Sequence, residues 1–572
     1  MRGPGSAAAG RPGIRAGQPA VIGVSLVVAA SLVAAGCGSS GSSSAAGCFP
    51  KRAAAGSSSP PPAASNAAPS GSPSPAAAAG WPLPGANLQN TRDVASAITS
   101  SNVSKLGVAW TVPIKATTLG LDYATTPVVV NGVVYTQDLK SNVMAIELAT
   151  GKVLWTHTYN SVNGGPEGVN VAGGTVYAAT SHAAVALSAA TGRQLWSRTL
   201  VGNDHEGIDM APGYHNGTVY VSTVPVNPTV GEYLGGAKAT LWALNARTGA
   251  PQWSWDEVQN LWGKPGINSG GGLWDPPSFD SQGNIYIGIA NPGPIAQNGW
   301  PSGYPWGTSR PGPDLYTDSV VKLSPHGRLL WYYQLTPHDL YDWDLQNSPV
   351  LTTANRRPVV IAGGKAGILV ELSEQTGKLI WKLPVGVHSG HDYDGLRTEY
   401  AKPAAHIPLP AKFCLEPGVF GGIESQLATN GSTTFAAVTN LPVPLSRNGV
   451  AESSAAFAAA VSQATGEMVA VNQDTGKLEW DDQLPSAPYG AATVTNNVVF
   501  TTTFHGDLYA FNTATGAVLL KTPMSAGSNA PVTIDGDYVI AGAGAAVSAS
   551  QRPLIIAYKL GATGRLPHTV GP

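Results

Sequence analysis

One short phrase recurs along this chain and constrains its fold more than any other feature. Residues 143–155 read Val-Met-Ala-Ile-Glu-Leu-Ala-Thr-Gly-Lys-Val-Leu-Trp, and the same frame returns at 185–196, 241–253, 320–331, 369–381, 468–480 and 508–520, the last with Leu520 in place of tryptophan. Each copy joins an alternating apolar strand, a turn that contains glycine and a second short strand that ends in an aromatic residue. The pattern predicts a β-hairpin repeated seven times.

A second strand pair precedes most of these hairpins. Examples are residues 127–137 around Asn131-Gly132 and residues 492–503 around Asn496-Asn497. Four strands per unit at a period of about 40 residues or more are typical of a β-propeller, whose blades leave only short, protected edges. In such a fold the tryptophan at the end of each hairpin is expected to wedge between neighbouring blades and to bury a large apolar area.

The two ends of the repeat region complete one another. A lone strand at residues 106–110 precedes the first unit, and the strands predicted at 538–543 and 554–559 lack a closing partner. Joining them makes an eighth blade from both ends of the chain. We therefore expect an all-β fold over residues 81–572: an eight-bladed β-propeller with four-stranded antiparallel blades, the last closed by N- and C-terminal strands.

One interval breaks the repeat. The distance along the chain from Trp381 to Trp480 is roughly twice the usual spacing. This leaves either a degenerate ninth blade or a long insertion. Residues 386–443 are rich in Pro, Gly and polar residues, with one clear strand at 433–438, so we favour an insertion.

The N-terminal segment predicts export and attachment to a membrane. Residues 1–36 combine three arginines with an apolar run at 21–35, which indicates a secretory signal and is short for a spanning helix. Its end, Val-Ala-Ala-Gly-Cys, resembles a bacterial lipobox, which implies a lipidated Cys37; a cleaved signal with an incidental cysteine and an uncleaved anchor remain alternatives. Residues 37–80 are almost entirely Ser, Gly, Ala and Pro and predict a disordered tether. We expect an extracytoplasmic, lipid-anchored protein.

The net charge and the number of cysteines argue against several classes of function. The net charge of −2 over 572 residues gives no reason to expect a nucleic-acid partner. With three cysteines, Cys37, Cys48 and Cys414, the sequence shows no disulfide framework, no zinc pattern and no Cys-x-x-Cys-His haem attachment. Any redox cofactor must be held by other means, and the sequence assigns no role to Cys48 or Cys414.

The densest polar stretch lies at residues 336–349. There Asp339, Asp342 and Asp344 follow His338, although only 12% of the chain is charged. Carboxylates so close repel one another unless a cation or hydrogen-bond donors hold them. The stretch therefore indicates a metal site, an acid/base role or a fully solvated acidic loop.

The hairpins are similar to the repeats of quinoprotein propellers, which bind pyrroloquinoline quinone (PQQ), and noncatalytic scaffold propellers also carry such repeats. The irregular stretches over residues 103–543 resemble the PQQ-dependent alcohol and sugar dehydrogenases as well. The resemblance implies hydride transfer from an alcohol or sugar hydroxyl to PQQ, a Ca²⁺ or lanthanide ion, and a cytochrome or quinone as electron acceptor. The alternative is a noncatalytic cell-envelope binding or assembly scaffold.

Three segments carry the site by resemblance. Residues 274–294 resemble the family segment in which a tryptophan forms the floor under the quinone and an asparagine before proline ligates the metal, which assigns Trp274 and Asn291. The acidic stretch is similar to the catalytic loop, with Asp342 as general base and metal ligand. Asp344 resembles an extra carboxylate ligand of some branches, including lanthanide-using ones.

The third segment, residues 363–372, resembles the one whose basic residue contacts the quinone oxygens, which implies Lys365. Glu232 is the candidate carboxylate ligand, although its spacing to the next strand is longer than the family pattern. These roles are chemically consistent: a hard cation takes oxygen ligands, an aspartate accepts the hydroxyl proton, and a lysine stabilises developing negative charge.

The sequence also departs from the family. No two cysteines are adjacent, so the ring that usually covers the quinone in the alcohol branch is absent. Residues 160–169, where it would lie, contain no arginine for the carboxylates of the quinone, and Asp122 is out of register with the family acid of the first blade. These departures are what favours the scaffold alternative.

Overall fold

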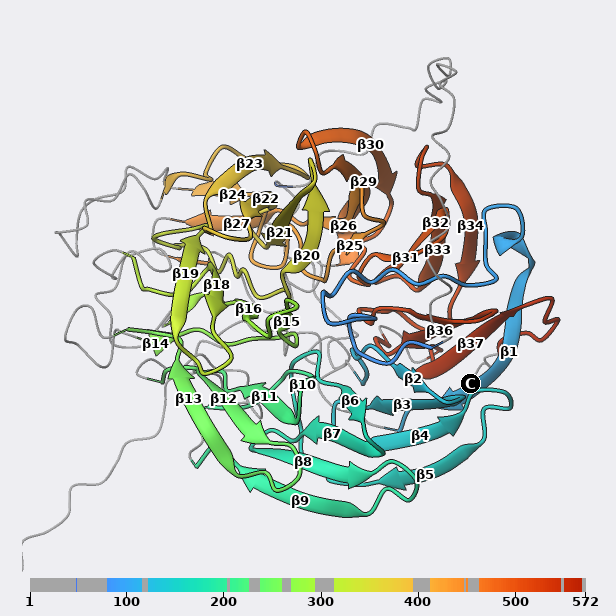
Figure 1. Cartoon of the computed structure of the whole chain (residues 1–572). Helices are drawn as coiled ribbons and strands as arrows, with labels where there is room; N and C mark the ends of the chain where they lie inside the picture. The colour runs from blue at the N-terminus through green and yellow to red at the C-terminus, as the bar shows by residue number, and fades with distance from the viewer. Residues whose placement is uncertain are drawn as a thin grey trace, which may run out of the picture.

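The computed structural model describes residues 48, 80–115, 122–202, 206–225, 237–259, 269–293, 313–394, 412–446, 449–450, 462–546 and 550–567. These residues form eight four-stranded antiparallel sheets arranged as blades around a common axis (Figure 1). The predicted eight-bladed propeller is therefore confirmed. The signal at residues 1–36, Cys37, nearly all of the predicted tether and Glu232 lie outside the described residues.

The strands of each blade follow one another from the axis outward. Blade 1 consists of β2 (Val128–Val130), β3 (Val133–Gln137), β4 (Val143–Glu147) and β5 (Val153–His157), and blade 2 of β6 (Val169–Ala172), β7 (Thr175–Ala179), β8 (Ala183–Ser188) and β9 (Gln194–Thr199). Blade 3 consists of β10 (Gly213–His215), β11 (Thr218–Ser222), β12 (Thr240–Asn245) and β13 (Pro251–Asp256), and blade 4 of β15 (Ser278–Phe279), β16 (Ile285–Gly288), β18 (Ser319–Leu323) and β19 (Leu329–Gln334).

Blade 5 consists of β20 (Val350–Ala354), β21 (Arg357–Gly364), β22 (Ile368–Ser373) and β23 (Leu379–Pro384), and blade 6 of β25 (Ala428–Thr429), β26 (Thr433–Asn440), β29 (Thr465–Asn472) and β30 (Lys477–Leu484). Blade 7 consists of β31 (Thr493–Thr495), β32 (Val498–Thr502), β33 (Asp507–Asn512) and β34 (Val518–Pro523). The short strands β14 (Ser269–Gly270) and β17 (Pro292–Gly293) pair outside the blades.

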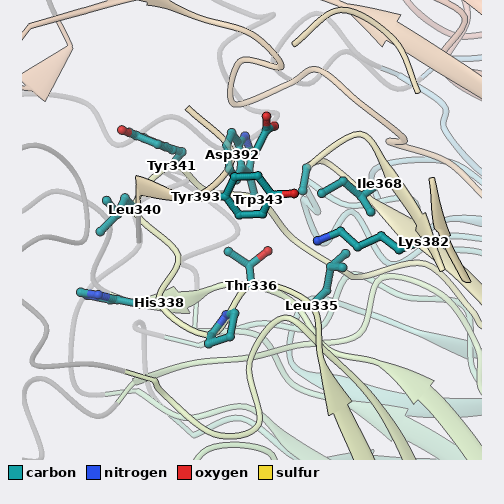
Figure 2. A pocket seen from close by; sticks show the side chains of 12 residues that line it. Leu335, Thr336, His338, Leu340, Tyr341, Trp343, Ile368, Lys382, Asp392 and Tyr393 are labelled. Carbon is teal, nitrogen blue, oxygen red and sulfur yellow. The ribbon is translucent and has the colours of Figure 1, made fainter. Parts of the chain in front are cut away.

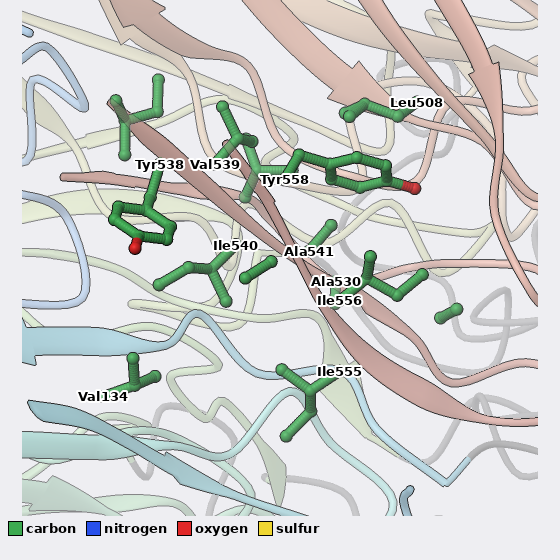
Figure 3. Packing of buried hydrophobic residues seen from close by; sticks show 14 of the residues in the cluster. Val134, Leu508, Ala530, Tyr538, Val539, Ile540, Ala541, Ile555, Ile556 and Tyr558 are labelled. Atoms are coloured by element: carbon green, nitrogen blue, oxygen red, sulfur yellow. The ribbon is translucent and has the colours of Figure 1, made fainter. Parts of the chain in front are cut away.

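Blade 8 closes the ring with strands from both ends of the folded region. Its order is β35 (Thr533–Asp535), β36 (Tyr538–Ala543), β37 (Leu554–Leu560) and β1 (Leu106–Pro113), and a short 3-10 helix, η3 (Val103–Lys105), leads into β1. Leu106 pairs with Leu560 and Pro113 with Leu554, as the predicted joining of the two ends requires. Figure 3 shows the buried side chains that hold this closure together: Tyr558 of blade 8 lies on the side of Leu508 of blade 7, and Ile540 and Ile555 lie on the other side, toward Val134 of blade 1.

The tryptophans wedge between blades as predicted. Trp381 of β23 lies on the Thr-Gly turn of blade 6, where a Cβ added to Gly476 would be only 2.6 Å from the indole. The indole Nε1 donates to the carbonyl of Gln473, just before that turn, at 2.9 Å. The same packing occurs in six other pairs: Trp110–Gly151, Trp155–Gly192, Trp196–Gly249, Trp253–Gly327, Trp331–Gly377 and Trp480–Gly516.

The missing tryptophan has a structural reason. Leu520 lies on β34, the outermost strand of blade 7, and faces blade 8. In blade 8 the two outer strands, β37 and β1, come from opposite ends of the chain, so no hairpin turn joins them. A tryptophan at position 520 would have no turn glycine to pack on, and Leu520 packs instead against the core shared by blades 7, 8 and 1.

The insertion is confirmed, and no ninth blade is present in the described part of the chain. The extra chain forms a small sheet from two connections: β24 (Lys412–Leu415) lies between blades 5 and 6, whereas β27 (Val443–Ser446) and β28 (Gly449–Val450) lie between β26 and β29 of blade 6. A disulfide joins Cys414 of β24 to Cys48, 366 residues earlier, with 5.7 Å between the Cα atoms. The sequence showed no disulfide framework and left the roles of Cys48 and Cys414 open, because this bond depends on the ring geometry and no local spacing reveals it.

Residues 80–102, here called the plug, run across one end of the ring, from its centre to the outer edge where η3 begins (blue in Figure 1). Their backbone pairs with strands or turns near the axis in six of the eight blades: with Val129, Phe279, Leu351, Thr429, Val494 and Gly536. Residues 96 and 98 accept hydrogen bonds from Asn496, in the turn between the two inner strands of blade 7. The plug therefore crosses one end of the propeller axis.

Within the described residues, no helix has the length and apolar character needed to cross a bilayer.

Candidate active site

The sequence-predicted residues gather at the end of the propeller opposite the plug. In a blade whose strands alternate in direction, the connection to the next blade and the turn between the two middle strands emerge at the same end, here called the site face. The Thr-Gly turns and the plug lie at the other end, here called the plugged face. Asp342 and Asp344 lie in the connection from β19 to β20, and Lys365 lies in the turn between β21 and β22. Five of the six predicted cofactor and metal residues thus come from connections at one face.

Lys365 and two carboxylates form the centre of the site. The Nζ of Lys365 lies 2.5 Å from Oδ2 of Asp344 and 3.4 Å from Oδ2 of Asp342. The other oxygen of Asp344, Oδ1, accepts a hydrogen bond from the backbone N–H of Asn291 at 2.6 Å. All four residues are buried, with at most 5% exposure. The structure therefore brings Asn291, Asp342, Asp344 and Lys365 together.

Two aromatic rings enclose the lysine. Its Nζ lies 4.9 Å from the ring centre of Trp274 and 5.4 Å from that of Phe420. Trp274 is only half-buried, whereas Phe420 is buried against the loop that carries the aspartates. The exposed part of the Trp274 ring is a flat apolar surface beside a fixed positive charge, which suits a planar anionic molecule.

The acidic stretch is buried rather than solvated. Asp339, Asp342 and Asp344 are exposed by 1%, 5% and 1%, which excludes a solvated acidic loop. Asp339 accepts hydrogen bonds from the backbone N–H groups of Tyr341 and Trp343, at 2.8 and 2.9 Å, and so folds the loop. Asp342 adopts a left-handed backbone conformation with φ of 65°. Such a conformation in a non-glycine residue is held by its surroundings.

Neighbouring side chains fix the loop from outside. The indole Nε1 of Trp343 donates to the carbonyl of Pro417, and the hydroxyl of Tyr341 donates to Asp394 at 2.6 Å. Both partners belong to the insertion before blade 6. A small pocket of about 40 Å³ lies on this side of the loop (Figure 2); Thr336, Trp343 and Tyr393 line it, and the amine of Lys382 extends toward Thr336. This pocket holds little more than water, so it is no cofactor site.

Burial controls the charges in the site. Burial raises the pKa of Asp342 well above its usual value, against the attraction of Lys365. Burial alone would lower the pKa of Lys365, but Asp342 and Asp344 outweigh it and raise that pKa, so the lysine stays protonated. A cation bound to the aspartates would act in the same direction as the lysine and favour their ionised forms.

Sequence reasoning missed three acids around this centre: Glu167 and Asp209, which are buried, and Glu424, which is half-buried. Burial raises the pKa of Glu424 to about 8, against the attraction of Lys365. Burial, together with the nearby charge of Asp344, raises the pKa of Asp209 to about 7. Glu167, whose pKa burial raises well above its usual value, is coupled in turn to Asp209. These residues belong to no recognisable motif, and only the closed ring brings them to the same face.

Glu167 lies in the stretch that the sequence singled out for its missing arginine. It accepts hydrogen bonds from Asn163 at 2.6 Å and from Ser141 at 3.2 Å. Glu167 and Asp209 each keep one oxygen without a hydrogen-bond partner among the described residues. This part of the site therefore presents acidic side chains, with pKa values raised by burial, where the family pattern leads one to expect a basic side chain.

The donor set fits a hard cation. The amide oxygen of Asn291 and the carboxylates of Asp342 and Asp344 are oxygen ligands of the kind that Ca²⁺ and lanthanide ions prefer. Within the described part of the chain, no three acidic, histidine or cysteine side chains already enclose a metal position. Glu232, which the resemblance implies as a further ligand, lies outside that part, in the connection between β11 and β12. Its placement stays a prediction.

Comparison with known families gives two matches. The model of the family described as "Glucose/ethanol/alcohol dehydrogenase, beta-propeller domain" matches residues 81–178 and 210–414, which include the predicted site. A second model, "Outer membrane protein assembly factor BamB", matches residues 140–265 and 464–559, which are mainly blade repeats. The first match covers more than half of the chain.

Individual relatives give the same result. The chain is 27% identical to the quinohemoprotein alcohol dehydrogenase of Comamonas testosteroni over 78% of its own length and 69% of that relative. It is 26% identical to the 1-butanol dehydrogenase (cytochrome c) of Thauera butanivorans over 77% of its own length and 70% of that relative.

Solved structures share the fold. The crystal structure of the Comamonas testosteroni quinohemoprotein alcohol dehydrogenase superimposes with a TM-score of 0.70 at 25% identity, covering 86% of this chain and 82% of that one. A europium-containing methanol dehydrogenase superimposes with a TM-score of 0.66 at 19% identity, covering 84% of this chain and 98% of that one, a likeness of fold alone.

Proposed function

Because the chain belongs to the glucose/ethanol/alcohol dehydrogenase β-propeller family, we propose that it is a PQQ-dependent dehydrogenase that oxidises an alcohol or sugar hydroxyl at the site around Asp342. The observation that carries this proposal is the contact of Lys365 with Asp342, Asp344 and the ring of Trp274. An ion pair that only stabilises the propeller core needs one carboxylate. Here Lys365 contacts two carboxylates and lies beside a half-buried aromatic ring.

The residues present fit PQQ on one side of the site. PQQ, when bound, supplies a quinone carbonyl that accepts hydride. The face of Trp274 would hold its plane, and Lys365 would stabilise negative charge on its oxygens. Asn291, Asp342, Asp344 and Glu232 would hold the cation. Glu167 and Asp209 do not fit the carboxylates of PQQ while ionised, and their raised pKa values favour the neutral forms that can accept such a neighbour.

Asp342 is the group that would take the substrate proton. Its carboxylate must be ionised to act as a base, and Lys365 at 3.4 Å favours that form against the effect of burial. The buried loop excludes water from the carboxylate, so a hydroxyl that enters the site meets a base without competing solvent. Its partner Asp344 stays fixed by the backbone of Asn291.

The identity of the cation and of the electron acceptor is part of the proposal. Two adjacent aspartates suit either Ca²⁺ or a trivalent lanthanide ion. The names of the relatives point to a haem or a cytochrome c as acceptor. These 572 residues contain no Cys-x-x-Cys-His sequence, so a covalently attached haem would lie outside them, and a membrane quinone is the second candidate.

We also propose an extracytoplasmic location at the membrane, with Cys37 as the lipidated residue. The disulfide supports an oxidising compartment, because disulfides form and persist outside the cytosol. Cys37→Ser should release the chain from the membrane fraction into the soluble fraction. Retention of this variant in the membrane fraction would contradict the lipid anchor.

A noncatalytic scaffold remains the second candidate. The assembly-factor match to residues 140–265 and 464–559 favours it, as does the acidic Glu167 in place of a basic group. The two candidates differ in whether the site binds PQQ.

Titration with PQQ separates them. Purified Cys37→Ser protein, which keeps the Cys48–Cys414 disulfide, is titrated with PQQ in the presence of Ca²⁺, La³⁺ or a chelator, and tryptophan fluorescence is recorded. A dehydrogenase should show saturable, cation-dependent quenching that Trp274→Leu abolishes, followed by reduction of an artificial dye with alcohols or sugars. Absence of binding with every cation would establish the scaffold alternative.

A further inference from the structure

The Cys48–Cys414 disulfide lies at the site face. Cys414 is in β24, between Phe413 and Leu415. The ring of Phe413 lies 6.4 Å from that of Tyr341, in the loop that carries the site aspartates. Leu415 is fully buried in the same apolar cluster as Tyr341 and Phe420. The disulfide is therefore attached to an element packed directly against the site loop.

The propeller itself begins at the opposite face. Gly80 lies beside the carbonyl of Val129, one residue before the turn from β2 to β3, and Trp81 pairs with the same residue. That turn belongs to the plugged face. Residues 48 and 80 are thus fixed to opposite faces of the propeller, and the chain between them must connect the two faces.

The position of the predicted lipid makes this difference important. Cys48 follows Cys37 by eleven residues, which span at most about 40 Å when fully extended. Gly80 follows Cys37 by 43 residues, which can span about 150 Å. With the disulfide formed, the eleven residues from Cys37 to Cys48 limit how far the lipid can lie from the site face, so the lipid is attached to that face. Without it, the only attachment is the long connection to the plugged face.

We propose that the Cys48–Cys414 disulfide sets which face of the propeller is held against the membrane. With the disulfide formed, the partner of the site face is the lipid bilayer itself, so this face is turned toward an acceptor confined to the membrane. This inference rests on the proposed lipidation of Cys37, and it deepens the proposed function without depending on turnover.

The test measures orientation. Full-length lipidated protein is reconstituted into phosphatidylcholine vesicles whose headgroups carry an acceptor dye. A donor dye is attached through an unnatural amino acid, which leaves the cysteines untouched, either at Val387 or at Ala514. Val387 is 46% exposed at the site face, and Ala514 is exposed in the Thr-Gly turn of blade 7 at the plugged face.

Energy transfer should be several-fold stronger from Val387 than from Ala514 in the unmodified protein. In Cys48→Ser and in Cys414→Ser this preference should be lost, and the two variants should behave alike because each breaks the same bond. Reduction of the unmodified protein with a dithiol should reproduce the variants. Cys37→Ser should give no transfer from either position.

Equal transfer from the two positions in the unmodified protein would overturn the proposal, as would a preference that survives in both serine variants. Failure of the full-length protein to bind vesicles would show that it has no lipid anchor, and this would also overturn the proposal. Because the readout is independent of catalysis, a protein that binds no PQQ would refute the dehydrogenase and still report its orientation.

Discussion

Lys365 is the residue on which the electrostatics of the site depend. It is fully buried and balances Asp342 and Asp344, with Glu424 nearby. Removing one partner of a buried ion pair typically costs about 3–5 kcal/mol, because the other charge stays behind unpaired. A cation at the aspartates would neutralise the same charges, so the lysine also keeps the cation-free site folded.

Asp342→Asn tests the base. Asparagine keeps the size and one oxygen ligand but cannot accept the hydroxyl proton, so dye reduction should fall by about 100-fold or more while PQQ binding persists. Turnover and fluorescence titration are measured on the same sample. Asp481→Asn, on the exposed face of β30, is the matched control and should keep full activity; equal activity in both variants would remove Asp342 from the mechanism.

Because Glu257 is buried with a raised pKa, we expect the stability of the protein to depend on pH. It is fully buried, receives hydrogen bonds from Ser222 and from the backbone of Gly272, and burial raises its pKa to about 8. The unfolded chain releases the Glu257 proton once the pH exceeds the ordinary pKa of about 4.5. The folded protein keeps that proton until the pH approaches 8. Stability due to this group is therefore full below pH 4.5 and is lost as the pH rises toward 8.

Glu257→Gln should abolish that loss. Urea unfolding at pH 5, 6.5 and 8 should show the variant gaining on the unmodified protein by a few kcal/mol as the pH rises, since each pKa unit corresponds to about 1.4 kcal/mol. Glu479→Gln, exposed on β30, should run parallel to the unmodified protein. A constant difference at all three values would show that Glu257 is already ionised in the folded state.

Only part of the site could be predicted from single residues. The sequence identified Trp274, Asn291, Asp342, Asp344 and Lys365, because each lies in a segment with its own recognisable pattern, and the structure brings them together. Glu424, Asp209 and Glu167 could not be found in this way, since their coupling depends on contacts between connections of different blades. Asp339 lies in the same acidic stretch, to which the sequence alone could give no single role, and it serves as a hydrogen-bond acceptor for the loop.

At the scale of the element, the hairpin with its Thr-Gly turn and tryptophan is the unit that builds the ring. Strand order and blade count could be predicted because every signal in this unit is local: alternation, a turn glycine and an aromatic at a fixed distance. Each hairpin also supplies the contacts to both neighbouring blades. Its turn glycine packs under the indole of the preceding blade, and its own tryptophan packs on the turn of the following blade. The exception at Leu520 follows from the same rule, applied to a blade without a hairpin turn.

Gly476→Ala tests this contact. Gly476 has φ of +66°, and a Cβ there would lie 2.6 Å from the Trp381 ring. Gly174 has a similar φ of +76° with nothing within 4 Å, so Gly174→Ala bears only the left-handed backbone cost of roughly 1–2 kcal/mol. Thermal unfolding should show a clearly larger loss for Gly476→Ala. Equal losses would mean that the indole can move aside and that the contact does not hold the blades together.

At the scale of the whole molecule, the plug and the disulfide tie the ring to segments outside the blades. Neither could be predicted, because both depend on residues that meet across the finished ring. Arg92 of the plug shows how strongly the ring holds it: the side chain is 1% exposed and donates to Pro84, Ala492, Thr493 and Val532. The plug therefore bonds the first folded residues to blades 7 and 8.

Arg92→Met should destabilise the protein by several kcal/mol, since buried carbonyls then lose their donors at about 1–3 kcal/mol each. Denaturant unfolding measures the loss, and Arg193→Met, at an exposed turn of blade 2, serves as the control. A small effect at Arg92 would show that the plug can leave the axis without loss of the blades.

The closure of blade 8 also fixes when this protein can fold during its synthesis. Leu106 pairs with Leu560, 454 positions later, so the ring cannot close until the ribosome has released the residues near 560. Contacts so distant in sequence form slowly and leave strand edges exposed in the meantime. If the chain is exported as proposed, β1 should stay unpaired until the residues near 560 have also crossed the membrane, so the ring should close only on the far side.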